Sequence, residues 1–473
     1  MKFFVTTAID YPSAKPHLGH ALEKIQADVI ARYKRKKGFK VHFSTGTDEH
    51  GLKILKQAQK NNQTPEQFVN KMVNHFKQLS QVLNISFDDF IRTTEPRHIQ
   101  TVEKVLDKII KNKDVYKGVY QGYYCVECET YYSKSELVNN LCPVHRLPVE
   151  YKQEESYFFK MSKYQDFLIK HIKDNSDFII PHYRANEILE RLKTPLRDLS
   201  ISRDISWGIP FPGDEKYVIA VWVDALINYL STINYPEQKF SEFWPADVHL
   251  IGKDILWHHS IIWGSLLKSA GLQLPKTLLV HGFITVEGKK MSKSLGNIID
   301  PIEVAEKYGA DTLRYYLLRE FPPFEDGDFS YTKLERRYNS DLADGLGNLV
   351  ARIEGIGSKF KYVKLKQAGY SSEEVKKIEK KFEQKMNQYK FNESLAAIWE
   401  LISYGDLYIN QRKLWRIEDP TEVSELIFIL KRISDLLSPF MPETAANIFK
   451  NIKPISPGKY LIKKGKPMFP KIK

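Results

Sequence analysis

The sequence predicts an α/β protein: a doubly wound parallel sheet, interrupted by an insertion and followed by an all-α C-terminal helical bundle. Residues 2–9 are a short apolar, β-favouring run, and Phe39 to Ser44 is another. Between them, apolar residues recur on one helical face, at Leu22, Ile25, Val29, Ile30 and Tyr33. A strand, a helix and a strand in this order form a βαβ unit, the building block of a Rossmann-type sheet.

The rest of the chain divides by composition. Residues 64–110 predict amphipathic helices, and 113–210 are tyrosine-rich and hold all three cysteines, which indicates an insertion. Further apolar runs predict the second half of the sheet, at residues 217–223, 248–251 and 277–280. From 336 onward proline and glycine are scarce and helical periods dominate. We therefore predict a Rossmann domain in two halves, 1–112 and 211–300, with an insertion between them at 113–210. A linking segment at 301–335 and a helical domain at 336–473 follow.

Length, charge and cysteine content narrow the class of protein. A chain of 473 residues is too long for one core, so we expect two or three domains. The formal net charge of +13 favours a polyanionic partner, nucleic acid or anionic membrane, although many basic proteins have neither. No run of 18 apolar residues occurs, which excludes a transmembrane helix, and the first residues lead directly into a strand, so we expect no leader peptide. Three cysteines exclude a disulfide scaffold and indicate a reducing, cytoplasmic setting.

Two histidines stand at the start of the first predicted helix, in Pro16-His17-Leu18-Gly19-His20. Ligands of an open parallel sheet bind beyond the carboxyl ends of its strands, where a helix N-terminus attracts phosphate. Gly19 allows a base or ribose to approach the backbone, and the two imidazoles can donate hydrogen bonds to phosphate oxygens. The pattern predicts a nucleotide site; a metal site and a chance pairing are the alternatives.

A lysine-rich loop lies about 270 positions downstream, in Lys290-Met-Ser-Lys-Ser294 with Gly288 before it and Gly296 after it. Two lysines three residues apart on such a loop can close over a triphosphate and stabilise the charge of its transition state. A solvated surface loop has the same composition, so this motif gains weight only beside the histidines.

Together the two motifs resemble the paired ATP signatures of the class I aminoacyl-tRNA synthetases. The resemblance implies that His17, His20, Lys290 and Lys293 act in catalysis. It also implies an ATP site, with Mg²⁺ accompanying the nucleotide, made of His17, Gly19, His20, Lys290, Ser292 and Lys293.

Residues around the predicted sheet resemble the methionyl-tRNA synthetase family within that class. The similar segments are 8–11, 46–51, 222–225 and 252–263. The resemblance implies that Asp48 binds the substrate ammonium, while a side-chain pocket is formed by Ile9, Tyr11, Trp222, Ala225, Tyr229, Ile255, His259 and Trp263. Aromatic rings suit a polarizable thioether, and Tyr or His can donate a hydrogen bond to its sulfur. Each aromatic residue taken singly is explained better as core packing. Leu226 stands where the family usually has proline, and His258 where an aromatic is common.

The cysteines predict a metal site by their spacing. Cys125-Val-Glu-Cys128 is followed after thirteen residues by Cys142-Pro-Val-His145. Three thiolates and one imidazole form the tetrahedral donor set that zinc prefers, and four protein ligands leave no open position. We therefore predict one structural Zn²⁺ per chain, with a redox or buried-thiol role as the alternative. A zinc-knuckle insertion also occurs in some methionyl-tRNA synthetases.

Three residues of the helical region are candidates for reading an anticodon. Asn348 and Arg352 lie four positions apart, on one helix face, and Trp415 follows late in the bundle. Amide and guanidinium groups can read base edges and an aromatic ring can stack an unpaired base, although such residues are more often solvent contacts or core. All three resemble the anticodon positions of the family, except that Leu414 replaces the usual proline.

The resemblance implies an enzyme, a methionine–tRNA ligase. It would activate L-methionine with ATP to methionyl-adenylate and transfer it to the 3′ end of tRNA(Met), as a monomer without a membrane partner. The alternatives are another class I synthetase, a different nucleotidyltransferase such as a pantothenate-type ligase, and a non-catalytic tRNA-binding paralogue, which we would expect to lack the lysine motif.

Overall fold

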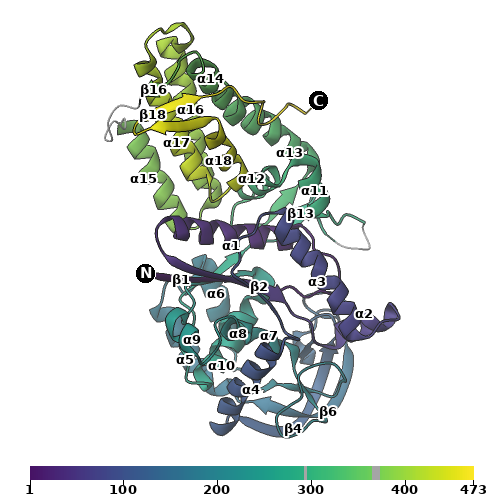
Figure 1. The fold of residues 1–473 in the computed structure, drawn as a ribbon. Coiled ribbons are helices and arrows are strands. Elements are labelled where there is room, and N and C mark those ends of the chain that lie inside the picture. The colour runs from purple at the N-terminus through teal and green to yellow at the C-terminus, as the bar shows by residue number, and fades with distance from the viewer. Residues whose placement is uncertain (292–295, 365–372, 473) are drawn as a thin grey trace. The chain divides into compact units, whose positions relative to one another are not determined.

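The computed structural model describes residues 1–291, 296–364 and 373–472, which fold into two compact units (Figure 1). The first unit contains residues 1–16, 34–78 and 86–281. The second contains 17–33, 79–85 and 282–473. In the described part of the chain, no helix combines the length and the apolar character needed to cross a bilayer.

A six-stranded parallel sheet forms the centre of the first unit. Its strands lie in the order β3 (Asp89–Arg92), β2 (Lys40–Thr47), β1 (Lys2–Thr7), β11 (Val248–Gly252), β12 (Leu278–His281) and β7 (Ile179–Ile180). Val5 of β1 pairs with Phe43 on one side and with Val248 on the other. The strand order reverses between β1 and β11, and ligands of doubly wound sheets bind beyond the carboxyl ends at this point. The predicted fold class is confirmed.

Three details of this sheet differ from the prediction. β3 lies within the stretch predicted to be helical, and β7 comes from the predicted insertion. The strand predicted over 217–223 is wrong: only Val218–Ile219 (β10) is extended, it pairs with Ser202–Arg203 (β9) outside the central sheet, and a helix begins at Val221. An apolar run is buried equally well as a strand or as a helix, so its composition does not separate the two.

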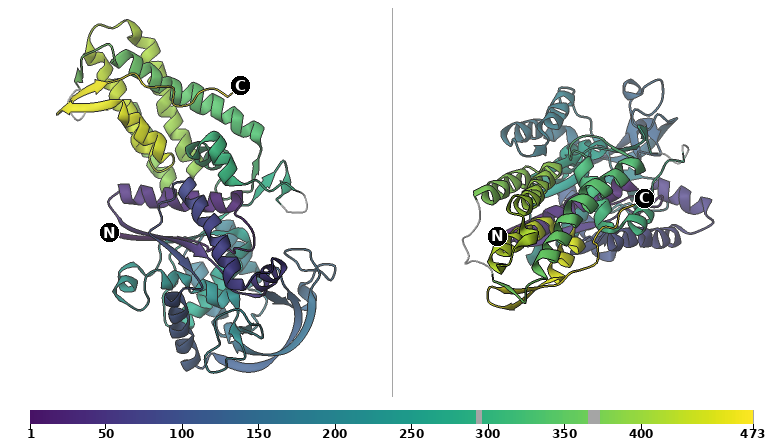
Figure 2. Two further views of the ribbon diagram at one scale, coloured as in Figure 1. Left: turned by 45° about the vertical axis from the view of Figure 1, so that its right-hand side comes forward. Right: turned by 90° about the horizontal axis from the view of Figure 1, so that it is seen from above.

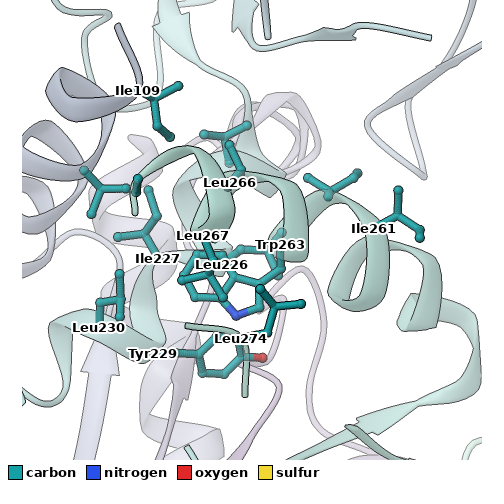
Figure 3. Packing of buried hydrophobic residues seen from close by; sticks show 14 of the residues in the cluster. Ile109, Leu226, Ile227, Tyr229, Leu230, Ile261, Trp263, Leu266, Leu267 and Leu274 are labelled. Atoms are coloured by element: carbon teal, nitrogen blue, oxygen red, sulfur yellow. The ribbon is translucent and has the colours of Figure 1, made fainter. Parts of the chain in front are cut away.

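Helices enclose the sheet of the first unit and supply its apolar core. They are α2 (Leu52–Lys60), α3 (Pro65–Val82, to residue 78), α4 (Pro96–Lys111), α5 (Gln165–Asp174), α6 (His182–Arg191), α7 (Val221–Leu226), α8 (Asn228–Ser231), α9 (Gln238–Phe243) and α10 (Trp263–Ser269). Figure 3 shows Trp263 among Leu226, Tyr229 and Leu267, all of them buried. Removing this much apolar surface from water is the main stabilising contribution to such a core.

The insertion contains an antiparallel sheet, with strands in the order β5 (Thr130–Tyr132), β4 (Val115–Cys125), β6 (Glu150–Phe159) and β8 (Leu199–Ser200). β4 and β6 pair along their whole length and form the long curved ribbon that is blue in Figure 2. Cys125 ends β4 and Cys128 lies in the turn to β5, so the sheet is the platform of the predicted knuckle.

The second unit is mainly helical. Its helices are α1 (Leu18–Lys36, to residue 33), α11 (Pro301–Tyr308), α12 (Ala310–Glu320), α13 (Tyr331–Arg337), α14 (Asn348–Gly357), α15 (Glu373–Asn387), α16 (Phe391–Arg412), α17 (Ser424–Leu437) and α18 (Pro442–Lys450). A π-helical stretch, Tyr338–Gly347, joins α13 to α14. The bundle also carries a small sheet that was not predicted, in the order β16 (Val363–Lys364), β18 (Lys459–Ile462) and β17 (Ile452–Ser456).

Candidate active site and metal centre

The histidine turn lies directly before and within the first turn of α1. The backbone N–H of His17 donates to Nδ1 of His20 over 3.0 Å, and the backbone N–H of Gly19 donates to Nδ1 of His17 over 3.1 Å. Each Nδ1 therefore accepts, which places the proton of a neutral ring on Nε2. Burial, with Lys24 nearby, lowers the pKa of His20 to about 3, so this ring is neutral at pH 7. A neutral Nε2–H group is still a hydrogen-bond donor.

A hairpin leads into the predicted lysine loop. Strands β13 (Ile284–Val286) and β14 (Lys289–Lys290) are antiparallel, and β13 also pairs with β15 (Gly327–Phe329). Asp328 holds the turn, because its Oδ1 accepts from the N–H of Gly288 over 2.7 Å, a residue with a positive φ of 73°. Lys290 is the last residue of β14, whereas Ser292 and Lys293 lie outside the described residues.

A cavity of about 260 Å³ lies in the first unit, close to the lower end of the usual range for small-molecule sites, roughly 300–1,000 Å³. Eight of the nine predicted methionine-binding residues line it: Ile9, Tyr11, Asp48, Trp222, Ala225, Tyr229, Ile255 and His259. The ninth, Trp263, is completely buried, with its ring 6.0 Å from that of Tyr229. These residues come from the ends of β1 and β2, from α7 and α8, and from the segment after β11, so the fold gathers them from four parts of the chain.

Asp48 is a buried carboxylate of this cavity. Its side chain is 8% exposed, and in the described part of the chain its Oδ1 has no hydrogen-bond partner. Burial, and then the charges of Asp224, Glu129 and Glu49, raise the pKa of Asp48 well above its ordinary value. A cationic group entering the cavity would favour the ionised carboxylate, which makes Asp48 a suitable partner for an ammonium group.

The hydrogen bond between Tyr229 and His259 fixes the polarity at the aromatic end. His259 Nδ1 lies 2.9 Å from the carbonyl oxygen of Ile255, which can only accept, so this nitrogen carries the ring proton. Burial lowers the pKa of His259 to about 4, so its Nε2 is an acceptor at pH 7. The Tyr229 hydroxyl therefore donates to Nε2, over 2.7 Å. Its single hydrogen already has an acceptor, so a thioether in this cavity relies mainly on shape and polarizability.

A buried network behind Asp48 was not assigned from the sequence. Asp224 is completely buried and accepts from His50 Nδ1 and from His98 Nε2, each over 2.7 Å. His98 Nδ1 also lies 2.9 Å from the hydroxyl oxygen of Ser231. Burial opposes ionisation of Asp224, but the two histidines prevail and lower its pKa to about 2. His50 and Asp224 stand in the recognised segments, but nothing local indicated that they meet each other.

The four predicted metal ligands converge in the insertion. One donor atom from each of Cys125, Cys128, Cys142 and His145 lies within 4.8 Å of all the others. Zn–S bonds of about 2.3 Å in a tetrahedron place ligand atoms roughly 3.8 Å apart, so this set fits the ion. Tyr132 donates its hydroxyl to Cys128 Sγ over 3.2 Å, the type of outer hydrogen bond that orients a thiolate ligand. The predicted grouping of ligands is confirmed.

Comparison with known proteins identifies the family. The model of the class I (M) tRNA synthetases matches residues 3–150 and 132–354, and that of the anticodon-binding domain of tRNA ligases matches 370–467. The methionine–tRNA ligase of Thermotoga maritima is 42% identical, over all of this chain and 80% of that protein. This chain belongs to the methionyl-tRNA synthetase family. The methionine–tRNA ligase of Brucella suis is 41% identical, over 94% of this chain and 91% of that protein.

A solved methionyl-tRNA synthetase has the same fold. The Mycobacterium tuberculosis enzyme, in a crystal structure with bound methionyl-adenylate, superposes with a TM-score of 0.92 at 34% identity. The superposition covers 99% of this chain and all of that one. The family resemblance stated from the motifs is confirmed.

The two departures from the family pattern lie in the cavity wall. His258 stacks on Trp222, with ring centroids 3.8 Å apart and an interplanar angle of 19°. Burial lowers the pKa of His258 to about 3, so at neutral pH it packs as an uncharged aromatic ring. Leu226 also lines the cavity and is 2% exposed, which places an apolar side chain in the same position as the family's proline.

The residues predicted to read the anticodon lie on α14 and just after α16. Asn348 begins α14 and is exposed, and Trp415 is 44% exposed. Arg352 is held by α16, because its Nη1 lies 2.7 Å from Asp406 Oδ1 and its Nη2 donates to Asn410 Oδ1 over 2.5 Å. Two of the three side chains are thus at the surface, and the third is fixed in one direction by its partners.

Proposed function

We propose that this chain is a methionine–tRNA ligase, which activates L-methionine with ATP to methionyl-adenylate and then transfers the methionyl group to the 3′ end of tRNA(Met). The observation that carries the proposal is the cavity beyond the carboxyl ends of β1 and β2. It combines a buried carboxylate, Asp48, with aromatic and apolar walls, which suits an ammonium group joined to an unbranched thioether side chain.

The amino-acid half of the site follows from that cavity. Asp48 binds the methionine ammonium, whereas Tyr11, Trp222, Tyr229 and His259 surround the side chain. Ile9, Ala225 and Ile255 complete the wall, and Trp263 supports it from the core behind Tyr229. Because Asp48 is desolvated, its interaction with an ammonium ion is stronger than the same pair would be in water.

The nucleotide half is proposed from the two motifs. Tyr11 of the cavity and His17 of the histidine turn are six positions apart in the sequence. The Nε2–H groups of His17 and His20 donate to phosphate oxygens, and Gly19 allows close approach of the nucleoside. Ser292 and the lysines of the downstream loop, Lys290 and Lys293, bind the other side of the triphosphate.

Catalysis then needs position and charge but no covalent enzyme intermediate. The methionine carboxylate attacks the α-phosphorus of ATP, pyrophosphate leaves, and His17, His20, Lys290 and Lys293 stabilise the charge that develops on the phosphate oxygens. Mg²⁺ bound with ATP neutralises phosphate charge. The terminal adenosine hydroxyl of the tRNA next attacks the carbonyl carbon of the adenylate, and AMP leaves.

We propose that Cys125, Cys128, Cys142 and His145 hold one Zn²⁺ per chain. Four protein ligands close the coordination shell, so the ion cross-links the knuckle and has no position for substrate.

The remaining parts of the chain bind the tRNA. Residues 336–473 would form the anticodon-binding domain, with Asn348, Arg352 and Trp415 contacting bases, and 301–335 would link it to the catalytic halves, 1–112 and 211–300. The net charge of +13 favours this partner. We further propose that the enzyme is a monomer and acts in the cytoplasm, where three unpaired cysteines stay reduced.

An exchange assay tests the substrate and the chemistry together. Purified protein is mixed with ATP, radiolabelled pyrophosphate and one amino acid at a time, and we expect label to enter ATP only with methionine. Exchange with another amino acid would identify a different class I synthetase. No exchange with any amino acid, alongside intact binding of tRNA(Met), would identify a non-catalytic paralogue.

A further inference from the structure

Glu129 follows the proposed zinc ligand Cys128 in the sequence, and its side chain contacts Tyr11 and the backbone N–H of Lys53. Its backbone is left-handed, with a φ of 49°, and its side chain is 7% exposed. Left-handed backbone is unfavourable for a residue with a Cβ, so such a position usually has a local reason. Here the conformation directs the carboxylate into the wall of the amino-acid cavity, beside Tyr11 and Asp48.

One contact of Glu129 fixes an aromatic wall of the cavity. The hydroxyl of Tyr11 lies 2.8 Å from Glu129 Oε1 and 2.8 Å from the carbonyl oxygen of His50. Both oxygens only accept, and the hydroxyl has one hydrogen, so the charged carboxylate is the stronger partner. The ring of Tyr11 therefore takes its orientation from a residue of the knuckle.

The same carboxylate caps the helix that follows the Asp48 loop. Helix α2 begins after Gly51, which has a positive φ of 103° and no side chain to cap the first backbone N–H groups. The N–H of Lys53 donates to Glu129 Oε1 over 2.7 Å. A Cβ on Gly51 would meet Glu129 Oε2 at 2.4 Å, so the carboxylate occupies the space directly above this glycine. A negative charge at a helix N-terminus is favourable.

We propose that Glu129 is a positioning residue for methionine, through which the metal knuckle holds both Tyr11 and the 48–51 loop in the geometry that binds the amino acid. This inference rests on the proposed function and adds to it a residue that touches two substrate-binding elements. Loss of the carboxylate leaves Tyr11 with the His50 carbonyl alone and leaves the start of α2 without its cap. Affinity for methionine should fall, whereas affinity for ATP should not.

The test compares Glu129→Ala and Glu129→Gln with a matched control, Glu150→Gln. Glu150 is another carboxylate of the insertion, and it pairs loosely with Lys56 of α2, over 3.9 Å. In the exchange assay we expect Glu129→Ala to raise the KM for methionine roughly ten- to hundredfold, the range for losing hydrogen bonds to a charged group. The KM for ATP should stay within about twofold, Glu129→Gln should be intermediate, and the control should behave as wild type.

Two further measurements separate positioning from general damage. The Kd of Glu129→Ala for methionine, measured by calorimetric titration, should rise by the same factor as its KM. The zinc content and the unfolding midpoint of that variant should match those of wild type. Tyr11→Phe should raise the KM for methionine in wild type but add little in the Glu129→Ala background, because residues that act through one contact are not additive.

The outcomes distinguish this inference from the proposed function. A wild-type protein that shows no methionine-dependent exchange overturns the proposed function. An active wild type with an unchanged KM for methionine in Glu129→Ala, or with equal changes in both KM values, overturns the role of Glu129 alone.

Discussion

Arg314 and Asp28 form an ion pair of 2.7 Å in which both side chains are completely buried. Arg314 lies on α12 and Asp28 on α1, the helix whose first turn carries the histidine motif. The guanidinium also donates to backbone carbonyl oxygens of Leu83, Pro439 and Phe440, so four of its five N–H groups have a partner. A buried charge of this kind is stable only while every partner is present.

Removing one member of this pair should destabilise the second unit strongly. Arg314→Met leaves the buried carboxylate of Asp28 with Arg32 as its ion-pair partner and removes the donor to three backbone carbonyl oxygens, and we expect a loss of about 3 kcal/mol in the free energy of unfolding. Urea denaturation followed by circular dichroism measures it. Lys381→Met is the control, because Lys381 pairs with Glu400 at the surface of the same unit and should lose less than about 1 kcal/mol. Equal losses in the two variants would contradict this account.

Stability should fall as the pH drops below about 6.5. Burial lowers the pKa of His20 and His258 to about 3 and that of His42 and His259 to about 4, whereas imidazoles of the unfolded chain titrate near 6.5. Between these values the unfolded chain binds more protons than the folded chain, so the free energy of unfolding rises with pH. The pKa of Asp224 is also lowered, to about 2, so the free energy of unfolding decreases further as the pH falls below about 4.

Midpoints of urea denaturation at pH 7.5, 6 and 5 measure how the stability depends on pH. His258→Phe keeps an aromatic ring against Trp222 and removes one titrating group, so its midpoint should change less between pH 7.5 and 5 than that of wild type. If wild type were equally stable at both values, the buried histidines would not be neutral.

Asp48→Asn should separate the two halves of the site. The amide keeps the size of the side chain but loses the charge that binds an ammonium ion, so we expect the KM for methionine to rise by roughly a hundredfold. Since burial raises the pKa of Asp48, the variant should fold at least as well as wild type at neutral pH. Exchange kinetics give the KM values, and thermal unfolding gives the stability. An unchanged KM for methionine would remove Asp48 from the site.

Metal removal should disturb the wall of the amino-acid cavity through Trp222. The indole Nε1 donates to the carbonyl oxygen of Cys128 over 3.2 Å, so a wall of the cavity rests on the backbone of the knuckle. After chelation we expect tryptophan fluorescence to shift and the calorimetric Kd for methionine to rise about tenfold, the cost of one or two such contacts. Added Zn²⁺ should restore both. A metal-free protein that binds methionine as wild type does would show that the knuckle is independent of the pocket.

The fold and the site were predictable where the signal is local. Spacing alone predicted that Cys125, Cys128, Cys142 and His145 come together, because each of the two knuckles places its two donors within a few residues of each other. β7 is two residues long and carries no period, so nothing in residues 179–180 indicated a sixth strand. The pairing of His98 on α4 with Asp224 on α7 joins positions 126 apart, and it depends on how α4 packs against α8, the helix that follows α7. Contacts of that kind come from tertiary packing, which one sequence does not encode in any local pattern.

Arg352 should matter for tRNA and not for amino-acid activation. Its side chain is 27% exposed and its guanidinium is fixed by Asp406 and Asn410, so it can offer a preorganised donor to a base. We expect Arg352→Ala to lower kcat/KM for aminoacylation of tRNA(Met) about ten- to hundredfold, the usual range of one to three kcal/mol for such a contact.

Methionine-dependent exchange, measured without tRNA, should stay within about twofold in the same variant. Arg432→Ala is the matched control, because Arg432 is half-buried in the same bundle and pairs with Glu379 and Asp435. It should leave both reactions near wild type. Were Arg352→Ala to reduce exchange as much as aminoacylation, its effect would lie in the stability of the bundle. If Arg432→Ala lowered aminoacylation as much as Arg352→Ala, the loss of any surface cation would explain the effect. Removing a positive charge near a tRNA weakens the electrostatic attraction.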